Sequence, residues 1–172
     1  MSDSHPCCWS EEQLLAQCRL TFSRASGPGG QNRNKVETSV QIEFLPTGTI
    51  ASASERRTQN ENRNVAIKRL RCKLAVEFRP SNAESPKLMG CSETWLLYCR
   101  NGRIDIAESN TDWPLILAEI IDSLHTMDWD IGQVSKNLGT SSSQLVKLLK
   151  RHSPAFLMLN SERKSRGKRS LE

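Results

Sequence analysis

The sequence predicts an α+β fold, in which a small antiparallel sheet packs on one long helix and a hairpin and a helical unit follow. Three patterns support this prediction. Apolar and polar residues alternate from Val36 to Phe44, which is the period of a half-buried strand. Between Thr58 and Phe78 the apolar residues recur at three- and four-residue spacing, which is the period of an amphipathic helix. From residue 113 onward, helix caps alternate with short apolar repeats.

The first predicted elements are a short helix and a strand. Ser10 followed by Gln13 matches a capping box, in which the two side chains satisfy free amides of a first helical turn. Leu20 and Phe22 then alternate with polar residues, as expected of a strand. We assign residues 1–18 to an N-terminal extension that contains this short helix.

A turn and a returning strand complete the predicted sheet. Residues 45–48, Leu-Pro-Thr-Gly, place a proline at the second position of a turn, and residues 49–54 return as the paired strand. The helix over residues 58–78 packs on this sheet and has a basic outer surface. We therefore assign residues 19–79 to one α+β domain. Prolines within a polar run mark residues 80–92 as a linker.

We predict a β-hairpin over residues 93–107. Its strands are Glu93 to Cys99 and Arg103 to Ala107, on either side of Asn101-Gly102. That pair suits a two-residue hairpin turn because both residues tolerate positive φ.

Residues 112–160 are predicted to form a helical unit, and residues 161–172 a basic tail. Asp112, Asp130 and Ser141 are placed to cap successive helices.

Part of this unit, residues 130–150, is similar to a Fis-type helix-turn-helix. Gly139 lies at the turn, and Gln144, Lys147 and Arg151 share an exposed face. Many small helical units have this pattern without binding DNA. We expect an accessory unit that docks on RNA or the ribosome, with DNA binding as the alternative.

The composition of the chain excludes several classes of protein. No run of about eighteen apolar residues occurs, and acidic residues precede the first apolar run, so we predict neither a membrane span nor a signal peptide. The six cysteines form no C-x-x-C pair and have no matching His cluster, which predicts reduced thiols in the cytoplasm and no metal site. We expect a monomer without a cofactor.

Positive charge is unevenly distributed over the chain, whose net charge is +5. Residues 19–79 hold twelve basic and five acidic residues, and residues 80–162 hold seven and ten. Residues 163–169 are again basic. Two separated basic regions indicate a polyanionic partner, and we expect that partner to be nucleic acid.

The most unusual segment is a glycine-rich loop, Ser26 to Asn34, which has no large apolar side chain to anchor it in a core. Gly29 and Gly30 permit positive φ and close approach of the backbone to another molecule. Gln31 offers an uncharged amide, with no nucleophile and no proton transfer near neutral pH. Walker and dinucleotide-binding loops are excluded, because the glycine spacing is wrong and no helix follows Gly30.

Three motifs in order resemble the catalytic domain of class I peptide chain release factors and of related codon-independent ribosome-rescue factors. They are Ser26-Gly27-Pro28-Gly29-Gly30-Gln31 with Asn34-Lys35, Leu45-Pro46-Thr47-Gly48, and Arg57-Thr58-Gln59 with Asn62-Arg63. The resemblance covers about residues 19–79. It implies a domain whose loop enters the peptidyl transferase centre of the ribosome.

The resemblance implies hydrolysis of the peptidyl-tRNA ester, with Gly29, Gly30 and Gln31 as the catalytic residues. The backbone amide at Gln31 would stabilise the charge that develops as water attacks the ester carbonyl, and its side chain would help to place the water. Gln31 is also the position that methyltransferases of the family modify. The implied partners are the ribosome and peptidyl-tRNA, with such a glutamine methyltransferase as a further candidate.

The sequence departs from the family pattern at two points. Asn32-Arg33 stands where the family commonly has His-Val. A factor that reads stop codons carries a codon-reading domain before this one, whereas only residues 1–18 precede it here. We therefore expect codon-independent release or rescue of stalled ribosomes.

Basic and polar residues around the loop and on the helix are predicted to contact ribosomal RNA. These residues are Arg24, Ser26, Arg33, Asn34, Lys35, Arg57, Gln59, Asn62, Arg63, Lys68, Arg69 and Lys73. In the rescue relatives a basic C-terminal tail lies in the empty mRNA channel. The corresponding residues here are Arg163, Lys164, Arg166, Lys168 and Arg169. For the helix cations and the tail, a solvated surface without a partner is the alternative.

Two other functions stay open. One is a nucleic-acid-binding regulator that uses the helix-turn-helix-like unit, and the other is a ribosome-associated factor without catalysis. The intact Gly-Gly-Gln sequence favours the hydrolase.

Overall fold

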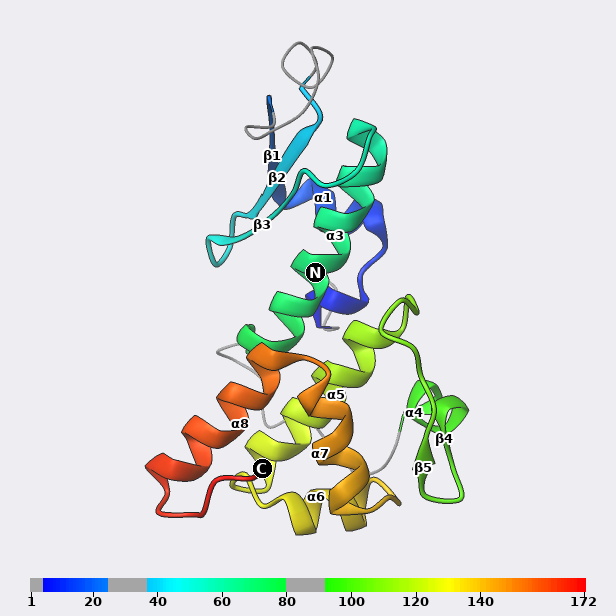
Figure 1. Cartoon of the computed structure of the whole chain (residues 1–172), viewed down its shortest axis with the longest axis vertical. Helices are drawn as coiled ribbons and strands as arrows, with labels where there is room; N and C mark the ends of the chain where they lie inside the picture. Colours follow the sequence, from blue (N-terminus) through cyan, green and yellow to red (C-terminus); the bar gives the residue numbers. More distant parts are fainter. Residues whose placement is uncertain (1–4, 25–36, 80–91) are drawn as a thin grey trace. The chain divides into compact units, whose positions relative to one another are not determined.

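The computed structural model describes residues 5–24, 37–79 and 92–172 of the chain. The chain forms two compact units, Met1–Phe78 and Arg79–Glu172. A sheet and a long helix make up the first unit, and the second is mostly helical (Figure 1). The α+β class predicted from the sequence is confirmed.

The described part of the first unit begins with the short 3-10 helix η1 (Pro6–Cys8) and helix α1 (Glu11–Ala16). Ser10 and Gln13 form the predicted capping box. Gln13 N donates to Ser10 Oγ over 3.2 Å, and Ser10 N donates to Gln13 Oε1 over 3.1 Å. Leu14 is buried in the core, so the predicted short helix is confirmed and belongs to the packed unit.

Strands β1 (Cys18–Ser23), β2 (Ser39–Phe44) and β3 (Thr49–Ala53) form an antiparallel sheet in that order. Ser23 pairs with Ser39 at one end of the β1–β2 ladder. The predicted pairing of the returning strand with β2 is therefore confirmed, and β1 pairs with the other side of β2, so that β1 and β3 are the edges of the sheet.

Helix α3 (Gln59–Glu77) packs on β2 and β3, as predicted for the amphipathic segment (Figure 1). Alternate residues of β2 and residues at helical spacing on α3 face each other, so the two periods of the sequence meet in one core. The core side chains are Leu14, Val40, Ile42, Phe44, Ala51, Ala53, Ala66, Ile67, Leu70 and Leu74. Burial of each large aliphatic side chain contributes roughly 1.5–3 kcal/mol to folding.

The segment from residue 93 to residue 98, predicted as a strand, is helix α4 (Glu93–Tyr98), so that prediction is wrong. Ser92 caps this helix, because its Oγ accepts a hydrogen bond from Trp95 N over 3.0 Å. The buried Trp95 then donates from Nε1 to Leu138 O over 2.9 Å. A cap and one tertiary anchor thus decide a short apolar run whose period fits either a strand or a helix.

The hairpin around Asn101-Gly102 is confirmed, but it is shorter than predicted. Its strands are β4 (Cys99–Arg100) and β5 (Arg103–Ile104). Asn101 and Gly102 have φ of 50° and 75°, as the two-residue turn requires.

Four further helices follow, as predicted from residue 113 onward. They are α5 (Trp113–Thr126), α6 (Ile131–Asn137), α7 (Ser142–Lys150) and α8 (Ser153–Ser165). Asp130 and Ser141 cap α6 and α7. Asp112 makes no capping hydrogen bond, because its carboxylate instead accepts from Tyr98 Oη over 2.8 Å.

Among the described helices, none is long and apolar enough to span a membrane. The described His, Cys, Asp and Glu side chains form no group of three that could hold a metal ion.

Candidate functional site

The predicted catalytic residues and four of the predicted RNA-binding residues lie outside the described residues: Gly29, Gly30, Gln31, Ser26, Arg33, Asn34 and Lys35. The structure describes the two ends of this segment. The chain leaves β1 after Ser23 and enters β2 at Ser39, and these two residues are paired across the sheet. Both ends of the loop segment therefore meet at one end of a hairpin, where Arg24 is exposed.

The returning end of the loop segment is tied to the start of α3. Asn62 Nδ2 donates to Thr38 O over 2.7 Å and to Arg56 O over 3.1 Å. Asn62 Oδ1 accepts from Arg56 N over 2.8 Å. Gln59 Nε2 donates to Glu37 O over 2.9 Å. The two amide side chains thus hold the residues that precede β2 against the helix, and we call this arrangement the amide clamp.

Asn62 has a structural role in place of the RNA contact that we predicted. Its side chain is fully buried, so it presents no surface to RNA. Both donor hydrogens and the acceptor oxygen are used within the clamp. Gln59 is exposed, and among the described residues its side chain makes only the bond to Glu37, which leaves its oxygen for an outside partner.

Thr58 begins α3 with a capping box beside the clamp. Thr58 Oγ1 accepts from Glu61 N over 3.2 Å, and Glu61 Oε2 accepts from Thr58 N over 3.1 Å. A further hydrogen bond from the Thr58 hydroxyl, together with the one from its backbone, holds the pKa of Glu61 below its ordinary value. Arg57 is exposed immediately before this cap, at the same end of α3 as the clamp.

Two of the predicted RNA-binding cations of α3 also bind the edge strand β3. Arg69 Nη1 donates to Ser52 O over 2.7 Å, and its Nη2 pairs with Glu55 at 2.7 Å. Lys73 Nζ donates to Ile50 O over 2.6 Å. Exposed edge carbonyls are a template for unwanted pairing, and these side chains cover them. Arg69 and Lys73 therefore stabilise the sheet whether or not they also contact RNA.

The other predicted cations of the first unit differ in how far they are engaged. Arg63 pairs with Glu11 at 2.6 Å and so connects α3 to α1. Among the described residues, no ion pair or hydrogen bond of the side chain engages Arg24, Arg57 or Lys68. These three cations are the ones most available to a phosphate partner.

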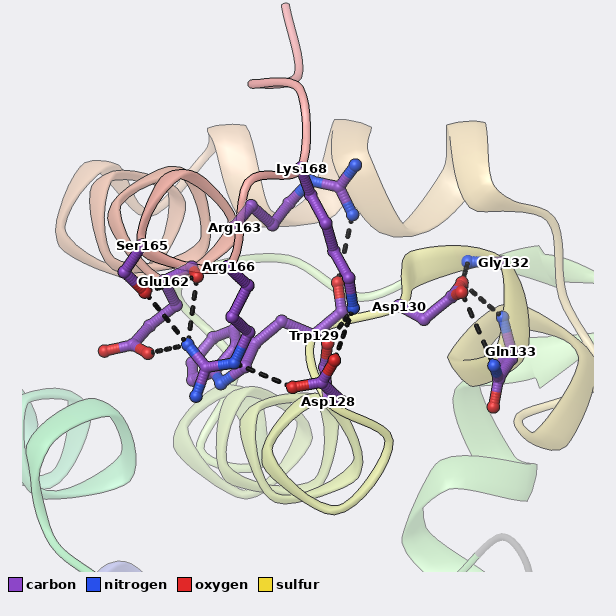
Figure 2. Close-up of polar contacts among 10 residues, drawn as sticks. All are labelled: Asp128, Trp129, Asp130, Gly132, Gln133, Glu162, Arg163, Ser165, Arg166 and Lys168. Atoms are coloured by element: carbon purple, nitrogen blue, oxygen red, sulfur yellow. Dashed lines mark hydrogen bonds and ion pairs between the residues drawn. The ribbon is translucent and has the colours of Figure 1, made fainter.

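The basic tail is folded back on the corner between α5 and α6, as Figure 2 shows. Arg166 Nε pairs with Asp128 Oδ1 at 2.8 Å, and Lys168 Nζ pairs with Asp128 Oδ2 at 2.8 Å. Arg163 Nη1 donates to Trp129 O over 3.0 Å. Asp128 and Trp129 both have left-handed φ, of 47° and 57°, which is uncommon for residues other than glycine.

The tail is thus partly neutralised by the unit that carries it. The hydrogen bonds from Lys168 and Arg166 hold the pKa of Asp128 below its ordinary value. Because this pKa is depressed, the attachment is present at neutral pH and is lost only as the pH falls through the lowered value. Among the described residues, the side chains of Lys164 and Arg169 have no such partner, and these two cations stay available.

The face of α7 that we predicted to be exposed carries Gln144, Lys147 and Arg151. The structure places these residues along a groove that Arg100 and Arg103 of the hairpin also line. Sequence reasoning missed the two arginines. The available signal was their symmetry about the turn, because directly opposed residues of a hairpin share one face.

Comparisons with known proteins match one part of the chain. The model of the RF-1 domain family matches residues 14–93. Peptide chain release factor 1 of Acidiphilium cryptum is 44% identical over 68 residues, which cover 40% of this chain and 19% of that protein. Peptide chain release factor PrfB1, chloroplastic, of Arabidopsis thaliana is 49% identical over 57 residues, which cover 33% and 12%. Peptide chain release factor 1 of Lactococcus lactis subsp. cremoris is 41% identical over 80 residues, which cover 44% and 22%.

The matched residues contain the sheet, α3, the amide clamp and the glycine-rich segment, and together these define an RF-1 domain. This domain is the part that the chain shares with class I peptide chain release factors. The matches span less than a quarter of the length of these three relatives.

Proposed function

We propose that this chain hydrolyses the ester bond of peptidyl-tRNA on the ribosome. The observation that carries the proposal is the RF-1 domain match, because residues 14–93 include Gly29-Gly30-Gln31. The amide clamp supports it, since a loop that must approach a reacting ester needs an anchored end, and the clamp holds Glu37 and Thr38 in place.

The chemistry follows from what the loop offers. Gln31 has no group that transfers a proton near neutral pH, so water attacks the ester carbonyl without a protein base. The backbone amide at Gln31 donates to the oxyanion as it forms, and the side chain places the water. The bond between the carbonyl carbon and the ribose oxygen then breaks. The peptide leaves with a carboxyl group, and the ribose oxygen takes up a proton from the attacking water to become a hydroxyl of the tRNA.

The proposal includes release that does not depend on a stop codon. The cations that the structure leaves available, among them Arg24, Arg57 and Lys68, are suited to phosphates. Contacts with phosphates position a protein on RNA but carry no sequence information. Gln31 is also the residue that we propose as a site of glutamine methylation, by an enzyme that would be a second partner.

The test is release of labelled peptide in water enriched in heavy oxygen. Ribosomes that hold peptidyl-tRNA and an empty A site are mixed with the protein, and the released peptide is weighed by mass spectrometry. We expect one heavy oxygen atom in the new carboxyl group of the peptide, because water supplies that atom. If the peptide stays on the tRNA, the result would support the alternative that this chain is a ribosome-associated factor without catalysis.

A further inference from the structure

The second unit contains a groove between its hairpin and α7. The groove has a volume of about 800 Å³, which lies within the range of sites that hold a ligand. Leu97 and Tyr98 of α4 line one part of it, and Ile104 of β5 and Leu148 of α7 line others. All of its lining residues lie beyond residue 93, in the part of the chain that the RF-1 family model does not match.

Positive charge dominates the polar lining of the groove. Arg100 and Arg103 come from the hairpin, and Lys147 and Arg151 come from α7 and its C-terminal cap. Arg151 is partly neutralised by Glu108, at 3.2 Å. Among the described residues, no ion pair engages the other three cations. Three uncommitted cations around one groove indicate an anionic ligand.

The two walls of the groove are fixed to each other before any ligand binds. Thr140 Oγ1, from the turn before α7, donates to Gly102 O of the hairpin over 2.7 Å. Trp95 Nε1 anchors α4 on Leu138 O over 2.9 Å. Arg151 is held over the ring of Trp113, 4.7 Å from its centroid. Because the elements that form the walls are already fixed, binding requires ordering only of the free side chains.

The walls also decide what kind of nucleic acid fits. A helix with its side chains is about 10–12 Å wide, and the major groove of B-DNA is about 12 Å wide. A recognition helix must therefore enter that groove alone. The hairpin lies beside α7 along the face that carries Gln144 and Lys147. The hairpin and α7 together are therefore too wide to enter the major groove. A single strand can instead pass between the walls.

Acceptor groups in the same groove favour RNA over single-stranded DNA. Asp105 lines the groove together with the cations, and Gln144 adds an amide oxygen. Phosphates only accept hydrogen bonds, so the Asp105 carboxylate and the Gln144 amide oxygen have no partner on a phosphate. Base amino groups donate in both RNA and DNA, and RNA adds one more donor per nucleotide. The ribose 2′-hydroxyl donates, and it is present only in RNA.

We propose that this groove binds a single-stranded segment of RNA, through phosphate contacts with Arg100, Arg103 and Lys147. The binding is separate from the proposed hydrolysis, so it is measured on the full chain without ribosomes. The probes are a labelled single-stranded oligoribonucleotide, the matching single-stranded DNA and the matching DNA duplex.

The test variant is Arg100→Gln with Arg103→Gln, and the measurement is fluorescence anisotropy over a series of salt concentrations. Losing two phosphate contacts on a single strand should flatten the slope of log Kd against log salt by about 1.4, since each contact contributes about 0.7. We expect Kd for the RNA probe to rise about tenfold or more at low salt. The matched control is Lys136→Gln with Lys150→Gln, which removes the same charge from the same unit outside the groove lining.

Two results would overturn the proposal. One is a test variant whose Kd and salt slope equal those of the control variant, because the groove would then bind no RNA. The other is binding of the DNA duplex as tight as that of the RNA probe, which would support the regulator with a helix-turn-helix. Photocrosslinking of a thiouridine-containing RNA to the peptide that contains Leu97 and Tyr98 is the independent supporting result.

Discussion

Gly30→Ala is expected to reduce peptide release by at least about 10² to 10³, the usual effect of losing one oxyanion donor. An added Cβ at this position restricts the backbone where it must turn and approach the substrate closely. Gln31→Ala leaves the backbone amide in place, so it should retain partial release. The glycine should therefore matter more than the glutamine side chain.

The measurement is single-turnover release on ribosomes that have no codon in the A site, with ribosome binding assayed in parallel. Gly30→Ala keeps Arg24, Arg57 and Lys68, so its affinity for ribosomes should stay close to that of the wild type. Release by Gly30→Ala at the wild-type rate would show that the loop is not the catalytic element. The binding-protein reading would then replace the enzyme reading.

Asn62→Ala is expected to lower both stability and release, because it removes the buried half of the amide clamp. Thr38 O and the backbone N–H and C=O of Arg56 would lose three hydrogen bonds, each of which contributes about 0.5–1.5 kcal/mol. We expect a net loss of about 2–3 kcal/mol in the free energy of unfolding. Displacement of the residues that anchor the loop segment should slow peptide release by about 10², which is the effect of misplacing a reacting group by about 1 Å.

Urea unfolding and single-turnover release at saturating protein separate the two effects. Asn62→Asp keeps the acceptor for Arg56 N but loses the donors to Thr38 O and Arg56 O and buries a carboxylate, so it should destabilise the protein at least as much as Asn62→Ala. Gln59→Ala removes one exposed hydrogen bond and serves as the milder comparison, with an expected loss of about 0.5–1.5 kcal/mol. A purely structural role would leave the release rate of the folded Asn62→Ala protein unchanged.

The sequence predicted most of the first unit, because its two hydrophobic periods are long and distinct. Alternation in β2 and the helical repeat in α3 each extend over several residues, and the capping box at Ser10 defines the start of α1. Helix α4 was missed because its apolar run, Trp95 to Tyr98, is only four residues long and fits either period. Its state depends on Ser92 and on a bond to Leu138, far away in the sequence.

The site was predicted as residue types and not as contacts. Asn62 is polar and lies near a helix start, which made RNA contact a reasonable expectation, yet its partners are backbone groups, which leave no sequence signal. In the same way, no local sequence pattern predicts the ion pairs of the tail with Asp128, which lies in a turn with positive φ. Local periods define elements, whereas long-range hydrogen bonds decide which polar residues are free.

The most direct test of codon-independent hydrolysis is release of labelled peptide from three kinds of programmed ribosome. The A site contains a stop codon, a sense codon, or no codon because the mRNA ends at the P site. We predict release from ribosomes with no codon, at a rate that a stop codon does not exceed. Release that occurs only with the stop codon, or with none of the three, would contradict the proposed function.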